Sequence, residues 1–197
     1  MIGGEHPGPV AIILAAGFSR RMGFDKLARE LGPTRGTLLA WAIRNCAGLT
    51  TIVVASRTLA ESASVSDASV VVVNDEPARG MTHSLRLGVA HVARSCPFAV
   101  MLADTPLVGV SDIMRLDAAR IGDGADVAFP QRGGVPGHPV VFGPSARDLL
   151  DGLPEGDSLR TLRGHPLLRT LAVAWSDDRP FVDIDDGAQF DRCSNQL

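Results

Sequence analysis

The residues of this chain best suited to chemistry lie in one short basic loop. The stretch LAAGFSRRMGFDK, residues 14–26, ends an apolar run and places Arg20, Arg21 and Lys26 in a turn of small residues. Small residues let a backbone approach a phosphate closely, and cationic side chains compensate its charge. The loop is therefore either a binding site for an anion or a solvated basic connection.

Two well-known phosphate-binding motifs do not describe this loop. Ser19 breaks the pattern G-x-G-x-x-G. Lys26 does not follow a glycine at the spacing of G-x-x-x-x-G-K-[ST]. The spacing disfavours dinucleotide binding and ATP hydrolysis of the P-loop type.

Carboxylates follow two other apolar runs. Asp104 comes directly after FAVMLA, and Asp183 and Asp185 come at the end of PFVDID. A carboxylate at a strand end that faces a phosphate loop can hold Mg²⁺ between nucleotide phosphates. Alternation along a strand would put Asp183 and Asp185 on one face, so both are candidates for the same metal.

These aspartates also have plain structural interpretations. Asp104 can be a turn residue before Pro106, with Ser111 capping the following helix. Asp186 can cap the last helix in the same way.

Two further stretches contain candidate contacts. Gly80 and Ser84, in ARGMTHSLRLG, stand at the start of a predicted helix, where they either contact a phosphate or nucleoside or serve as an ordinary cap. His138, in GGVPGHPVVF, is either a substrate contact or the anchor of a hairpin.

Apolar runs separated by helix-length segments predict how these residues are positioned. Continuous apolar runs are typical of strands buried on both faces, so they indicate an α/β fold with a mostly parallel sheet. Ligands of such sheets bind outside the carboxyl ends of the strands. The predicted strands are residues 10–15, 51–55, 69–73, 98–103 and 126–129.

The remaining segments complete the predicted order of elements. Helices are expected over 37–48 and 82–95, where apolar residues recur at helical spacing. After residue 130 the Gly/Pro-rich stretch predicts a hairpin or a crossing strand outside the parallel half. Two short helices and another strand follow, and residues 180–193 are predicted as a strand end leading into a final helix.

Composition limits the classes of function. The length of 197 residues suits one domain, over 1–197, and 45% hydrophobic with 21% charged residues indicates a packed core. A net charge of −3 argues against a nucleic-acid or membrane partner. Cys46, Cys96 and Cys193 lack the spacing of a zinc site or a disulfide framework. With no leader-like or membrane-spanning stretch, we expect a cytoplasmic protein.

Taken together, the motifs resemble the MobA/MocA-like nucleotidyltransferases. LAAGFSRRMGFDK is similar to their nucleotide-binding signature, and GMTHSLRLGV, LADTPLV, GHPVVFG and VDID follow in the order of the family. The resemblance spans nearly the whole chain, and it is nearest to the molybdenum cofactor cytidylyltransferase branch. It implies a Rossmann-like three-layer α/β/α fold of the nucleotide-diphospho-sugar transferase type, with a nucleotide-binding half over about 8–110 and an acceptor-binding half over about 111–197.

The resemblance also implies a reaction and its residues. An NMP would pass from an NTP to a phosphorylated acceptor such as molybdopterin, with Mg²⁺ and release of pyrophosphate. CTP is favoured over GTP because the loop reads LAAG, and a molybdoenzyme is a possible partner. The implied triphosphate site is formed by Leu14, Ala15, Ala16, Gly17, Arg21 and Lys26, and Gly80 and Ser84 would lie beside the nucleotide. The implied metal ligands are Asp104, Asp185 and Asp183. The implied contacts of the acceptor are His138 and Thr105.

Three positions depart from the pattern of the family and leave alternatives open. His83 stands where relatives commonly have a small residue or serine, Ala103 where they commonly have a glycine, and Thr105 where they commonly have a glutamine. In addition, the Thr-Pro that usually follows the last aspartates is absent. The alternatives are GMP transfer, a non-pterin phosphate acceptor, or a degenerate protein that binds a cofactor without turnover.

Overall fold

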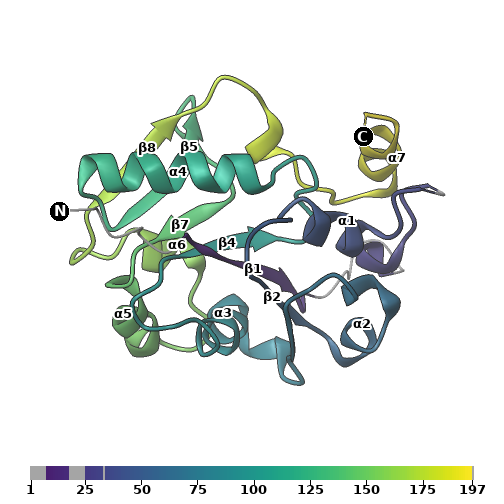
Figure 1. Cartoon of the computed structure of the whole chain (residues 1–197), viewed down its shortest axis with the longest axis horizontal. Coiled ribbons are helices and arrows are strands. Elements are labelled where there is room, and N and C mark those ends of the chain that lie inside the picture. The colour runs from purple at the N-terminus through teal and green to yellow at the C-terminus, as the bar shows by residue number, and fades with distance from the viewer. Residues whose placement is uncertain (1–7, 18–24, 33, 197) are drawn as a thin grey trace.

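The computed structural model describes residues 8–17, 25–32 and 34–196, and Figure 1 shows the arrangement of the elements. Arg20 and Arg21 lie outside these described residues. Within them, eight strands form one mixed sheet in the order β3-β2-β1-β4-β7-β5-β6, with β8 paired to β5. The strands are β1 (Val10–Ala15), β2 (Thr51–Ala55), β3 (Val70–Val73), β4 (Phe98–Leu102), β5 (Val127–Arg132), β6 (Val135–Pro136), β7 (Val140–Phe142) and β8 (Thr170–Ala174).

The sheet is parallel except at two strands. β3, β2, β1 and β4 run in one direction, and β8 is parallel to β5. β7 is antiparallel to both β4 and β5, and β6 is antiparallel to β5. The predicted α/β fold with a mostly parallel sheet is confirmed, and the change of pattern after residue 130 corresponds to the β5–β6 hairpin and the crossing strand β7.

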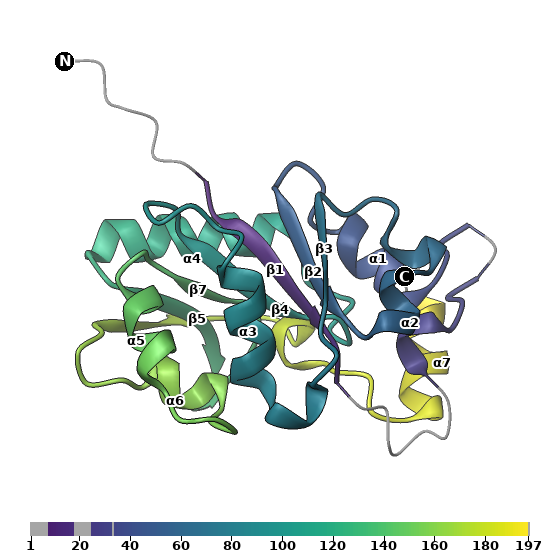
Figure 2. The same ribbon diagram turned by 90° about the horizontal axis from the view of Figure 1, so that it is seen from below.

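Helices cover both faces of the sheet, which gives the three predicted layers. Side chains of α1, α4 and α7 belong to one hydrophobic cluster, and those of α3, α5 and α6 belong to the other. Figure 2 shows α3, α5 and α6 in front of the strands. The helices are α1 (Leu38–Arg44), α2 (Arg57–Ala60), α3 (Met81–Val89), α4 (Val110–Asp123), α5 (Ala146–Gly152), α6 (Leu159–Arg163) and α7 (Gly187–Gln196), and the 3-10 helices are η1 (Lys26–Ala28), η2 (Ala63–Val65), η3 (Pro77–Arg79) and η4 (Arg179–Phe181).

The central strand β1 shows why a continuous apolar run was needed. Ala11 and Ile13 point into the first cluster and Ile12 into the second, and all three are fully buried. On the second face, α3 packs tightly on β1 and β2 because Gly88 has no side chain. A Cβ at Gly88 would lie 2.7 Å from Cγ2 of Ile12.

Several local predictions differ from the structure. The strand predicted before the final helix is wrong: no strand covers 182–186, because this segment runs beside the end of β4 without joining the sheet. The predicted helices 37–48 and 82–95 are real but end earlier, at Arg44 and Val89. Ser111 does not cap α4, because that helix already begins at Val110 and its N-cap is Gly109, whose N–H is accepted by the Asp112 carboxylate.

Candidate functional site

A cavity of about 330 Å³ opens at the carboxyl ends of β1 and β4. These two strands are neighbours, and a hydrogen bond of 3.2 Å from the Ala103 N–H to the Leu14 carbonyl joins their ends. The predicted nucleotide-binding residues of the described chain all line this cavity, together with Asp104: they are Leu14, Ala15, Ala16, Gly17, Lys26, Gly80 and Ser84. The edge rule for parallel sheets therefore located the cavity correctly.

Lys26 lies between two carboxylates at the floor of the cavity. Its ammonium donates to Oδ2 of Asp104 at 2.7 Å and to the carbonyl of Ile184, and it lies 3.9 Å from Oδ1 of Asp185. The side chain of Lys26 is 12% exposed and that of Asp104 is 25% exposed, so this ion pair is partly desolvated. A desolvated cation between two anions is strongly held, and the pair of carboxylates is suited to hold a cation.

The backbone after η4 brings Asp185 to this position. The Ile184 N–H donates to the Asp104 carbonyl at 3.0 Å, so the two carboxylate-bearing segments are joined directly. Asp186 and Gln189 then form a reciprocal cap for α7: Oδ1 of Asp186 accepts the Gln189 N–H at 2.7 Å, and Oε1 of Gln189 accepts the Asp186 N–H at 2.9 Å. The predicted capping role of Asp186 is confirmed.

Asp183 lies differently from its predicted position beside Asp185. It is exposed and lines a separate hollow with Phe181, Val182 and Gln189, among others. The prediction that both aspartates share one strand face fails because no strand exists there. Of the two, Asp185 is the one placed at Lys26.

The start of α3 forms another wall of the cavity. Gly80 has φ +92°, a conformation that favours glycine, and it precedes the first helical residue. The hydroxyl of Ser84 accepts a hydrogen bond of 2.9 Å from the amide of Asn74, which is 1% exposed. Asn74 was missed in the sequence, although it follows the apolar run of β3 in the same way as Asp104 follows β4.

The predicted acceptor contacts His138 and Thr105 are not among the residues that line this cavity. Thr105 is 3% exposed, and its hydroxyl donates to the Leu102 carbonyl at 2.8 Å. The backbone N–H of His138 donates to the Pro180 carbonyl at 2.9 Å, and Nδ1 of its ring is buried without a partner among the described residues. Burial lowers the pKa of His138 below its usual 6.5, although the carbonyl of Val100 and the carboxylates of Asp104 and Asp183 act in the opposite direction.

Similarity to known proteins identifies the type of domain. A family model described as the MobA-like NTP transferase domain matches residues 11–172. The chain belongs to this family. The family predicted from the sequence motifs is therefore confirmed, and the cavity lies within the matched MobA-like domain.

A curated relative gives a more specific similarity. Molybdenum cofactor guanylyltransferase from Rhodopseudomonas palustris (strain HaA2) is 34% identical to this MobA-like chain over 144 residues. The aligned part covers 70% of this chain and 65% of the relative, so the chain matches about two thirds of that protein's length.

Solved structures share the fold of the MobA-like chain. Rv0371c from Mycobacterium tuberculosis H37Rv superimposes with a TM-score of 0.73 at 22% identity, covering 96% of this chain and 99% of that one. Molybdopterin-guanine dinucleotide biosynthesis protein A from Archaeoglobus fulgidus has a TM-score of 0.73 at 18% identity, covering 95% and 97%. A manganese complex of Rv0371c has a TM-score of 0.70 at 22% identity, covering 96% and 100%.

The two carboxylates at Lys26 are suited to hold a divalent cation together with other ligands. Among the described residues, no group of three or more His, Cys, Asp or Glu side chains could hold a metal by itself. Asp104 and Asp185 nevertheless flank a cation, the Lys26 ammonium. Mg²⁺ and similar hard ions are commonly held by one or two carboxylates plus substrate phosphates and water.

None of the helices in the described ranges combines the length and the apolar character that a membrane-spanning helix needs.

Proposed function

We propose that this chain transfers a nucleoside monophosphate from an NTP to a phosphorylated acceptor and releases pyrophosphate. The observation that carries the proposal is the placement of Lys26 between Asp104 and Asp185 at the floor of a cavity formed by the β1 turn and the start of α3. Such a site offers a cation and metal-binding oxygens to a polyphosphate, and small residues that let its backbone approach.

The proposed reaction needs no nucleophilic side chain. An oxygen of the acceptor phosphate attacks the α-phosphorus of the NTP, and the bond from that phosphorus to the oxygen bridging to the β-phosphorus breaks, so pyrophosphate leaves with the electron pair. The attacking oxygen is already anionic, so the protein must mainly align the two substrates and offset their repulsion.

In the proposed mechanism, residues of this chain hold the triphosphate. The backbone of residues 15–17 and the start of α3 would approach the phosphates, and the Lys26 ammonium would move from the carboxylates to the phosphate oxygens. Asp104 and Asp185 would hold Mg²⁺ or Mn²⁺, and a manganese complex of a structural neighbour supports this choice of ion. A metal ion held by these residues would supply positive charge that offsets the charge of the phosphates. Arg21, which lies outside the described residues, is proposed as a further triphosphate contact.

Two observations bear on which nucleobase the NTP carries, and they favour different nucleotides. The small-residue turn LAAG resembles the cytidine-using members and favours CTP. The guanylyltransferase that is 34% identical favours GTP and GMP transfer. A thermal-shift series with each NTP and Mg²⁺ decides between them, because the nucleotide that binds more tightly raises the melting temperature more at equal concentration.

Molybdopterin is the proposed acceptor, as the names of the relatives from Rhodopseudomonas and Archaeoglobus suggest. The proposed acceptor contacts are His138 and Thr105, and the side chain of Arg163 strengthens the choice of an anionic acceptor. Arg163 is half-buried over the ring of Phe129, 4.4 Å from its centroid, and among the described residues no carboxylate lies within ion-pair distance of it. Arg163 also contributes to the lowered pKa of His138, so the two are electrostatic neighbours. A half-buried arginine that has no carboxylate partner in the described part of the chain supports an anionic acceptor near it.

The test is pyrophosphate release with GTP or CTP, Mg²⁺ and molybdopterin. We expect release that depends on both substrates, and a KM for the acceptor that rises at least several-fold in Arg163→Ala. Arg160→Ala is the matched control, since Arg160 lies on the same helix but is exposed; its KM should stay near that of the wild type. Equal effects of the two substitutions would remove Arg163 from the acceptor site.

A binding protein without turnover is the rival function, favoured only by the departures at His83, Ala103 and Thr105. Ala103 is 1% exposed within the core and Thr105 is buried, and neither of them is one of the charged residues Lys26, Asp104 and Asp185 that form the proposed site. Binding of molybdopterin without nucleotide, and no pyrophosphate release with any NTP, would establish the rival and exclude the transferase.

A further inference from the structure

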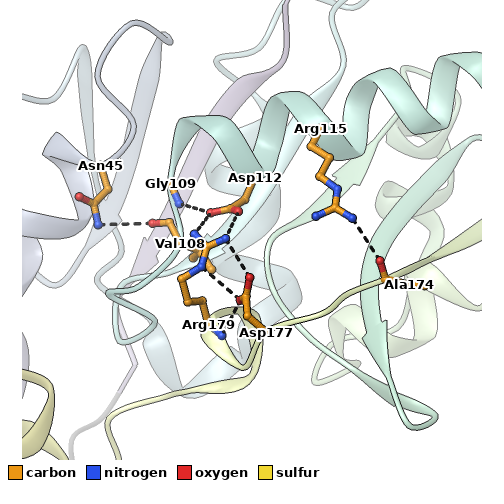
Figure 3. A network of polar contacts seen from close by, with 8 residues as sticks. All are labelled: Asn45, Val108, Gly109, Asp112, Arg115, Ala174, Asp177 and Arg179. Carbon is orange, nitrogen blue, oxygen red and sulfur yellow. Dashed lines mark hydrogen bonds and ion pairs between the residues drawn. The ribbon is translucent and has the colours of Figure 1, made fainter. Parts of the chain in front are cut away.

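A buried carboxylate outside the cavity links the two segments that carry Asp104 and Asp185. Asp112 is the third residue of α4, and its side chain is 4% exposed. Its Oδ2 accepts the Gly109 N–H at 3.0 Å. Both of its oxygens face Arg179, with Nη2 to Oδ1 at 3.2 Å and Nη1 to Oδ2 at 3.4 Å (Figure 3). A buried carboxylate requires such compensation, so this pair is retained in the folded state.

Arg179 fixes the beginning of the segment that leads to Asp185. We define the strap as residues 177–186. The Arg179 guanidinium donates from Nε to Oδ1 of Asp177 at 3.1 Å and from Nη2 to Oδ2 at 3.2 Å, as Figure 3 shows. One side chain therefore holds the turn at the start of the strap and also ties it to α4.

Beyond Arg179, hydrogen bonds join the strap to His138, just before β7, and to the cavity residues Asp104 and Lys26. The Pro180 carbonyl accepts the His138 N–H at 2.9 Å. Gly137 allows this close approach, since a Cβ there would lie 2.4 Å from the Pro180 oxygen. The strap then reaches Ile184, whose N–H donates to the Asp104 carbonyl at 3.0 Å and whose carbonyl accepts from Lys26.

Asp112 also forms a hydrogen bond with the segment that follows Asp104. This segment, residues 104–109, ends at Gly109, whose N–H is held by Asp112. Helix α1 and its C-cap, Asn45, hold the middle of this segment. Nδ2 of Asn45 donates to the carbonyls of Pro106 at 2.9 Å and Val108 at 3.4 Å, and Nε1 of Trp41 donates to the Pro106 carbonyl at 3.0 Å. Asp112 is thus bonded both to the segment after Asp104 and, through Arg179, to the strap.

We infer that Asp112 and Arg179 are positioning residues that set the separation of the Asp104 and Asp185 carboxylates for a divalent metal. The inference rests on the proposed function, because it assumes that these two carboxylates hold the metal. Neither Asp112 nor Arg179 lines the cavity above Lys26. Removal of either should weaken metal binding without removing a ligand. Loss of a group bonded directly to a metal ligand typically lowers affinity roughly 10- to 100-fold, and because Asp112 and Arg179 act through the backbone, we expect the lower end of that range.

The test is Mn²⁺ binding to the metal-free protein, followed from the EPR signal of free Mn²⁺ with and without a saturating NTP. We expect Asp112→Asn and Arg179→Ala to raise the Mn²⁺ dissociation constant by roughly tenfold. Arg179→Lys keeps the charge but not the forked contact and should give an intermediate value. Arg115→Ala is the matched control: Arg115 is also on α4, donates to the Ala174 carbonyl at 3.2 Å and lies 3.9 Å from the centroid of the Trp175 ring, and among the described residues no hydrogen bond or ion pair joins it to either segment.

Steady-state kinetics gives a second measurement. The Mn²⁺ concentration for half-maximal rate should rise in Asp112→Asn and Arg179→Ala, whereas the rate at saturating Mn²⁺ should stay nearer that of the wild type. If Arg179→Ala does not fold, because it leaves the buried Asp112 carboxylate without its cation, Asp112→Asn and Arg179→Lys carry the test. Asp112→Asn removes the buried charge and leaves Arg179, whose side chain is 44% exposed, paired with Asp177.

The outcomes separate this inference from the proposed function. If Asp104→Asn abolishes Mn²⁺ binding but Arg179→Ala and Asp112→Asn bind it like the wild type, the positioning role is overturned and the metal site stands. A lower melting temperature with an unchanged dissociation constant would likewise reduce the pair to a structural role. If the wild type binds no Mn²⁺ even with an NTP, both ideas fail together.

Discussion

At the scale of single residues, Lys26 acts as the internal counter-ion of the site. It neutralises Asp104 and lies near Asp185, and its ammonium occupies the space between two carboxylates. A metal ion and this ammonium repel each other when both are close to the same oxygens. A polyphosphate offers Lys26 other anionic partners, so nucleotide and metal should bind more tightly together than apart.

We predict that Lys26→Met binds Mn²⁺ more tightly than the wild type when no nucleotide is present, by roughly tenfold, since a few ångströms separate the charges. The same variant should lose roughly a hundredfold or more in turnover, by analogy with loss of one charge-stabilising donor. Calorimetry of Mn²⁺ binding and a pyrophosphate-release assay measure the two effects. Weaker Mn²⁺ binding in Lys26→Met would show that the lysine supports the metal instead of excluding it.

The neighbouring aspartates give a matched pair of substitutions. Asp185→Asn removes a charge 3.9 Å from Lys26, so we expect Mn²⁺ affinity and turnover to fall at least tenfold. Asp183→Asn removes an exposed charge that lines a different hollow and should change both by less than threefold. Metal titrations of the two variants test the assignment. The reverse order of effects would return Asp183 to the metal site.

At the scale of elements, the start of α3 depends on a glycine that no other residue replaces well. Gly80 has φ +92°, and a Cβ there would lie 3.2 Å from Cα of Gly156 in the segment after α5. Arg79 and Glu155 form an ion pair across the same contact. This contact fixes the helix start whose residues Gly80, Met81 and Ser84 line the cavity.

Gly80→Ala should therefore destabilise the protein by about 1–3 kcal/mol and weaken NTP binding, because the strained backbone shifts the helix start. Gly122→Ala is the control: it lies in α4 with no atom within 4 Å of an added Cβ, and it should stabilise the protein by about 0.5–1 kcal/mol. Urea denaturation and thermal shifts with NTP measure both. If Gly80→Ala is as stable as the wild type, the conformation of residue 80 is not a constraint on α3.

At the scale of the whole molecule, His138 makes stability depend on pH. Burial lowers the pKa of His138 in the folded chain below the 6.5 of an unfolded chain. At a pH between the folded and the unfolded pKa, the unfolded chain therefore binds more protons than the folded chain. Stability should be full above about pH 6.5 and fall as the pH drops below it, by at most about 1.4 kcal/mol per pH unit from this group.

His138→Gln removes this titration. In urea denaturation at pH 7.5 and 5.5, we expect the wild type to lose more stability between the two values than His138→Gln does. The backbone N–H that donates to the Pro180 carbonyl is kept in the variant, so the comparison isolates the ring. Parallel losses in the two proteins would contradict a depressed pKa of His138.

Much of the fold and part of the site could be predicted from the sequence. Buried parallel strands must be continuously apolar, so the runs of β1, β2 and β4 were recognisable, and the first residues after β1 and β4 had to lie at one edge of the sheet. That reasoning found Gly17, Lys26 and Asp104. It failed for the segment before α7, where β-branched residues next to aspartates resemble a strand but pair with no other strand.

The sequence by itself determined the α/β class, the family motifs and the group of residues around the first turn, because these depend on local periodicity and on spacing within one segment. Only the tertiary structure decided that Lys26 pairs with Asp104, 78 residues away, that Asp185 and not Asp183 joins them, and that Asp112 with Arg179 secures both segments. The physical reason is that such pairs depend on where distant segments cross and which charges they bury together, and neither is recorded in the pattern of any one segment.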